Sequence, residues 1–127
     1  MGDLVCLELS VLLWLAHVLV QAFAGNAEFG LEYLLSPRDG QPPAKGVACG
    51  RATRALNNYI ESLVPFVALA LALVATGKAG GLGATIWIIA RILYLPSYVM
   101  GVTYVRTALW GISAVGLLTM LARLAFS

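Results

Sequence analysis

The feature that most constrains this chain is a series of four long apolar runs with little polar sequence between them. The runs cover about residues 4–24, 51–76, 82–101 and 105–126. A helix that crosses the hydrocarbon core of a bilayer needs roughly 20 mainly apolar residues, and each run is about that long. The chain has 127 residues, of which 61% are hydrophobic and only 11% are charged, unlike an ordinary soluble domain. We therefore predict an all-α integral membrane protein, a single domain of four spanning helices.

Lysine and arginine placement predicts how these helices are oriented. The connection at about 25–50 is long, and with its flank it carries Arg38, Lys45, Arg51 and Arg54, whereas the N-terminal end carries no cation. Cytoplasmic loops of membrane proteins are enriched in Lys and Arg. We therefore expect this loop and the short turn between the third and fourth runs to be cytoplasmic, with both chain termini outside.

A stripe of polar residues marks the start of the second apolar run. Arg51, Arg54, Asn58 and Glu61 are spaced by 3, 4 and 3 residues, so they share one face of a helix. Ionisable groups inside a membrane are costly and normally face the inside of a bundle, where they are paired or bind a ligand. The stripe is therefore the first candidate for a functional site.

The third and fourth runs carry a second set of polar residues. Arg91, Tyr94 and Tyr98 share one helical face, and Arg106 opens the fourth run. At a rise of about 1.5 Å per residue, Arg91 and Glu61 both lie roughly 15 Å from the cytoplasmic ends of their helices. Because an unpaired charge at that depth costs several kcal/mol, we predict an Arg91–Glu61 ion pair, within or between subunits.

Together these residues indicate a cationic pocket that opens to the cytoplasm. The following fall within about two helical turns of that membrane surface, on three separate segments: Arg51, Arg54, Asn58, Tyr98 and Arg106. Arginine binds carboxylates through paired hydrogen bonds, so the expected ligand is a small anion or a zwitterion with more than one carboxylate. Arg38 in the long loop is either a further contact to this ligand or a solvated charge that sets topology.

Several other kinds of chemistry find no support in the sequence. There is no Ser-His-Asp set, metal cluster or phosphate-binding loop, and the net charge of +2 is too small to indicate nucleic acid. His17 is the single histidine and makes a poor metal site on its own. His17 and Gln21, one turn apart, are expected to form interhelical hydrogen bonds. A nucleophile would have to come with the ligand.

Three motifs resemble those of a known family. They are R-x-x-R-A-x-x-N-x-x-E-x-x-x-P-F over residues 51–66, A-R-x-x-Y-x-P-x-Y over 90–98 and Y-x-R-T over 104–107. This pattern resembles MAPEG, the membrane-associated proteins of eicosanoid and glutathione metabolism, from one end of the chain to the other. The third-run sequence is similar to the bacterial branch of the family, which implies a bacterial inner membrane.

The resemblance implies a homotrimer of four-helix bundles that binds glutathione between neighbouring subunits near the cytoplasmic face. The positions that match glutathione-contacting or pocket-lining positions of the family are Arg51, Arg54, Asn58, Glu61, Tyr94 and Tyr98. Arg106 matches the arginine that stabilises the glutathione thiolate. Basic residues that some members carry near the end of the first helix have no clear counterpart, and Arg38 is the nearest candidate.

The implied activity is a glutathione-dependent transferase or peroxidase reaction on a lipophilic electrophile or hydroperoxide that arrives from the bilayer. Two alternatives remain open at this point. One is a small proton-coupled multidrug-type exporter that uses Glu61 as its coupling residue. The other is a non-catalytic MAPEG-like membrane protein with a degenerate site.

Overall fold

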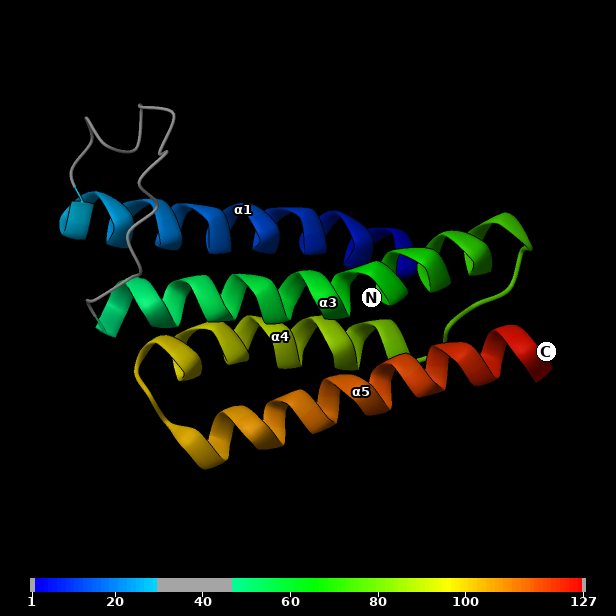
Figure 1. Ribbon diagram of the computed structural model, residues 1–127. Helices are drawn as coiled ribbons and strands as arrows, with labels where there is room; N and C mark the ends of the chain where they lie inside the picture. Colours follow the sequence, from blue (N-terminus) through cyan, green and yellow to red (C-terminus); the bar gives the residue numbers. More distant parts are fainter. Residues whose placement is uncertain (1, 30–46, 127) are drawn as a thin grey trace.

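The computed structural model describes residues 2–29 and 47–126, which form a bundle of four helices. These helices are α1 (Asp3–Phe29), α3 (Val47–Ala75), α4 (Gly83–Val99) and α5 (Thr103–Phe126). Successive helices run antiparallel, so the start of α1, the α3–α4 connection and the end of α5 lie at one end of the bundle (Figure 1). The start of α3 and the α4–α5 connection lie at the other end. The predicted all-α four-helix bundle is confirmed.

The helices are longer on both sides of the first connection than the sequence indicated. α1 continues to Phe29 and α3 begins at Val47, so both ends of the loop predicted at about 25–50 are helical. Arg38 and Lys45 lie outside the described residues. α4 and α5 begin and end within a few residues of the predicted bounds.

The length and composition of the helices suit a bilayer. Three of them contain segments long and apolar enough to cross a membrane: Asp3–Asn26, Gly50–Ala75 and Tyr104–Phe126. The fourth apolar helix, Gly83–Val99, has 17 residues, which is at the short end of the range for a spanning helix. These properties support an integral membrane protein.

The bundle is assembled from two closely packed helix pairs. α1 packs on α3, α4 packs on α5, and α3 and α4 join the pairs, while α1 and α5 do not touch within the described residues. The α4–α5 approach is closest at two glycines, because a Cβ on Gly116 would lie 2.7 Å from the Gly83 carbonyl oxygen. Small residues allow helices to approach this closely in membranes. α5 has fewer contacts with α3 than with α4, and a cleft separates α5 from α3.

An aromatic cluster fills the space between α1, α3 and α4. Tyr59, Phe66 and Trp87 are fully buried. The rings of Phe66 and Trp87 stack with their centroids 3.9 Å apart, and Tyr59 stacks on His17 of α1 at 4.4 Å. The Tyr59 hydroxyl donates a hydrogen bond to the Ser10 carbonyl oxygen of α1. This cluster fixes the rotation of α3 relative to its two neighbours.

Hydrogen bonds to other helices were expected from two residues of α1, and one of these residues forms such a bond. Gln21 donates to Thr53 Oγ1 of α3 at 3.4 Å, as expected. Within residues 2–29 and 47–126, His17 makes no hydrogen bond to another helix, and its Nδ1 pairs with the Leu13 carbonyl oxygen of its own helix at 2.8 Å. The reason is that the face of the imidazole stacks on the Tyr59 ring of α3, and this stacking sets the orientation of the His17 side chain.

Candidate functional site

At the end of the bundle where α3 begins, two arginines from different helices share one tyrosine of α4. The Nε atom of Arg54 on α3 donates to the Tyr98 hydroxyl oxygen at 3.3 Å. The guanidinium carbon of Arg106 on α5 lies 4.7 Å from the centroid of the Tyr98 ring, in a cation–π contact. Three helices therefore meet in one basic cluster, consisting of Arg54, Tyr98 and Arg106. Arg54 is exposed within a single chain and is accessible to a ligand.

Arg51 lies apart from this basic cluster, at the end of α4. Its Nη1 donates to the Val99 carbonyl oxygen at 3.2 Å, and the guanidinium packs against Gly101. A Cβ at Gly101 would come within 2.7 Å of the Arg51 guanidinium carbon, and the glycine has a φ of +78°. Arg51 thus satisfies a terminal carbonyl and places a positive charge at the C-terminus of α4.

Tyr94 connects the basic cluster to the interior of the bundle. Its ring lies 5.6 Å from that of Tyr98, centroid to centroid, and it is almost completely buried. The guanidinium carbon of Arg91 also contacts Tyr94 and lies 4.1 Å from its ring centroid. Tyr94 therefore packs between the Tyr98 ring and the Arg91 guanidinium.

Arg91 does not form the predicted ion pair within the chain. It is fully buried, and its Nη1 donates to Asn58 Oδ1 at 2.9 Å, whereas Glu61 is exposed. Depth along a helix fixes the level of a side chain but not its direction around the axis, and Asn58 is the residue that faces α4 at this level. Pairing with Glu61 of another subunit stays a prediction, which the complete burial of Arg91 within its own chain disfavours.

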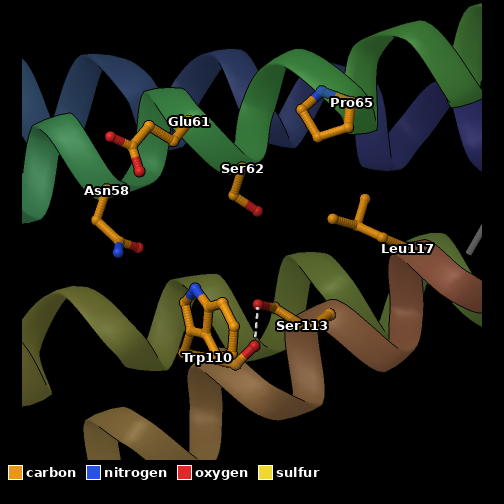
Figure 2. Close-up of a pocket in the computed structure, with 8 residues that line it drawn as sticks. Asn58, Glu61, Ser62, Pro65, Trp110, Ser113 and Leu117 are labelled. Carbon is orange, nitrogen blue, oxygen red and sulfur yellow. Dashed lines mark hydrogen bonds between the residues drawn. The ribbon is translucent and has the colours of Figure 1, made fainter.

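A cavity of about 260 Å³ lies between α3 and α5 (Figure 2). Its lining residues follow Arg54 and Arg106 by about one to three helical turns. It is lined by Asn58, Glu61, Ser62 and Pro65 of α3 and by Trp110, Ser113, Ala114 and Leu117 of α5. Two of the expected site residues, Asn58 and Glu61, therefore share one cavity. The α5 residues were not singled out from the sequence, although their spacing of 3, 1 and 3 is that of one helical face.

The site carries positive groups at one end and a carboxylate in its wall. The basic cluster supplies two guanidinium groups, which bind carboxylates, and Glu61 supplies an acceptor for a cation. Among the described residues, no group of three or more His, Cys, Asp and Glu side chains could hold a metal ion. The arrangement suits a zwitterionic molecule that carries its own reactive group.

Comparisons with known proteins agree with this description. The family model of MAPEG matches residues 4–126, almost the whole chain. No curated protein matches, and no solved structure matches. Because the family model covers the four helices and the site between them, the chain belongs to the MAPEG family.

Proposed function

We propose that this protein is a glutathione-dependent membrane transferase or peroxidase that acts on a lipophilic electrophile or hydroperoxide. Membership of the MAPEG family supports a role of this kind. The observation that carries the proposal is the convergence of Arg54 and Arg106, from α3 and α5, on the single side chain of Tyr98. Two guanidinium groups from different helices, close together at one end of the site, favour an anion with several oxygen atoms.

Glutathione matches the charges of this site. It has two carboxylates and one ammonium group, for which the basic cluster and the Glu61 carboxylate are complementary partners. Asn58 lies in the same cavity as Glu61 and offers hydrogen bonds to the peptide groups. The proposed binding residues are those expected from the sequence: Arg38, Arg51, Arg54, Asn58, Glu61, Tyr94 and Tyr98.

Arg106 is the proposed catalytic residue. A thiol with a pKa of about 8.5 is only a few per cent ionised at neutral pH, and a guanidinium beside the sulfur favours the thiolate. Each unit by which the pKa falls corresponds to about 1.4 kcal/mol. The thiolate sulfur then bonds to an electrophilic carbon as the leaving group departs with its electron pair. With a hydroperoxide, it bonds to the terminal oxygen and displaces an alkoxide, which takes up a proton.

The proposed working form is a homotrimer in a bacterial inner membrane, with both termini outside. Support comes from α3, where Arg54, Asn57 and Glu61 are exposed on a single chain although α3 is a spanning helix. Polar groups of this kind are not left facing lipid tails. Neighbouring copies of the chain would cover this face and enclose the ligand between subunits.

The test is turnover of glutathione with a chlorinated dinitrobenzene and with an organic hydroperoxide by the purified protein. Arg106→Ala is expected to lower kcat/KM by about 100-fold, the usual loss when one group that stabilises a developing anion is removed. Arg123→Ala is the matched control, because it removes an arginine from the opposite end of the same helix. Equal activity of Arg106→Ala and the unchanged protein would contradict the catalytic assignment.

The same preparation separates the two alternatives. An exporter would show pH-driven substrate uptake in liposomes that Glu61→Gln abolishes, and a non-catalytic protein would show neither uptake nor turnover. Family membership favours the transferase or peroxidase over the exporter.

A further inference from the structure

Two buried N–H donors of α4 form hydrogen bonds with polar side chains of α3 that line the cavity. Arg91 Nη1 donates to Asn58 Oδ1 at 2.9 Å, and Trp87 Nε1 donates to Ser62 Oγ at 2.8 Å. Arg91 and Trp87 are both fully buried, whereas Asn58 and Ser62 line the cavity between α3 and α5 (Figure 2). Each of these polar wall groups therefore has one side facing α4 and one side facing the cavity.

The chemistry of the donors decides which atoms are left for the cavity. A guanidinium has no acceptor, so only the oxygen of the Asn58 amide can face Arg91. The two N–H bonds of Nδ2 are then left over, and no hydrogen bond of this atom occurs within residues 2–29 and 47–126. An indole N–H is likewise a donor only, so Ser62 Oγ accepts from Trp87 and keeps its own O–H to donate.

Aromatic rings enclose Arg91 on the side of α4 that faces Asn58. Its guanidinium lies 4.1 Å from the ring centroid of Tyr94 and 5.5 Å from that of Tyr59. Tyr59 in turn stacks on His17 and donates to the Ser10 carbonyl oxygen. This packing places Arg91 Nη1 against the Asn58 amide, so the amide oxygen is the atom that faces α4.

We propose that Arg91 and Trp87 are positioning residues that commit Asn58 and Ser62 to donate hydrogen bonds to an acceptor oxygen of the ligand. That oxygen belongs to a carboxylate or a peptide carbonyl. Glu61 in the same wall is the complementary acceptor for a ligand ammonium group. The inference rests on the proposed function, because glutathione is the molecule taken to occupy the cavity.

Asn58→Asp tests the inference, with glutathione binding measured by calorimetry on the purified protein. The aspartate has the shape of asparagine and pairs directly with Arg91, but it has no N–H to offer the cavity. We expect the Kd for glutathione to rise at least tenfold while the thermal midpoint stays the same or rises. Asn26→Asp is the matched control, since it makes the same change at an exposed asparagine of α1, outside the cavity lining.

Trp87→Phe provides a second test that changes no charge. The ring remains to stack on Phe66, but the N–H that orients Ser62 is lost. We expect KM for glutathione to rise about threefold with kcat almost unchanged, the size of one neutral hydrogen bond. Because no carboxylate is introduced, this variant separates lost hydrogen bonding from charge repulsion.

The outcomes distinguish this inference from the proposed function. If the unchanged protein binds glutathione and both Asn58→Asp and Trp87→Phe bind it equally well, the positioning roles are wrong and the function stands. If the unchanged protein binds no glutathione, the proposed function fails and the inference fails with it. Weaker binding in both variants, with Asn26→Asp unaffected, supports the inference.

Discussion

The two faces of α3 have opposite environments. The face toward α1 and α4 carries Tyr59 and Phe66, which are fully buried and in contact with other aromatic rings. The face toward α5 carries Glu61, which is exposed, lines a cavity and has no hydrogen-bond partner within the described residues. Asn58 lies at the boundary and belongs to both.

The difference shows how polar groups in a membrane helix divide between structure and function. On the packed face, the Tyr59 hydroxyl has an acceptor inside the chain, and the rings of Tyr59 and Phe66 pack on Trp87 of α4, so these groups contribute to stability. On the open face, a carboxylate without a partner is a cost that only a ligand or another subunit can offset. Variants of the two faces should therefore separate into stability effects and binding effects.

The largest expected effect is on the packed face. Trp87→Ala should destabilise the protein by about 3–5 kcal/mol, because it empties a fully buried site against Phe66 and Tyr59. Unfolding in detergent, followed by circular dichroism, measures this. Trp110→Ala is the control, since that indole is 51% exposed and lines the cavity, and it should change stability little. Equal losses from the two variants would remove the distinction between the faces.

An intermediate effect is expected on the open face. Glu61→Gln should weaken glutathione binding about tenfold, or roughly 1.4 kcal/mol, because a charge-assisted hydrogen bond to the ligand ammonium is lost. Calorimetric titration gives the Kd, and the thermal midpoint should not fall, since the carboxylate has no partner to lose within the described residues. Glu8→Gln, at an exposed carboxylate of α1, is the matched control. A lower midpoint with unchanged Kd would place Glu61 among the structural residues.

The smallest effect is expected from one hydroxyl of the packed face. Tyr59→Phe removes the hydrogen bond to the Ser10 carbonyl oxygen and should cost about 0.6 kcal/mol, the average for interhelical hydrogen bonds in a membrane protein. The same unfolding measurement detects it against Tyr104→Phe, whose side chain is 89% exposed. Glutathione affinity should not change, and a loss of affinity without a loss of stability would assign Tyr59 to the site.

The sequence was informative about the site wherever spacing within one helix was enough. The 3–4–3 spacing on α3 placed Asn58 and Glu61 together, and both line the same cavity. Spacing was not enough where the partner within the chain depended on how two helices are rotated relative to each other. Arg91 was matched to Glu61 by depth, but the packing of the aromatic cluster turns Asn58 toward Arg91 instead.

The sequence by itself determined the number of helices, their membrane character and the family, because apolar length and residue spacing are local properties of the chain. Only the tertiary structure decided which polar groups have partners and which face the cavity. Arg51 shows the reason, since its position on the polar stripe could not indicate that its guanidinium donates to the Val99 carbonyl oxygen of α4. The rotation of each helix depends on how all its neighbours pack, and no single segment encodes that.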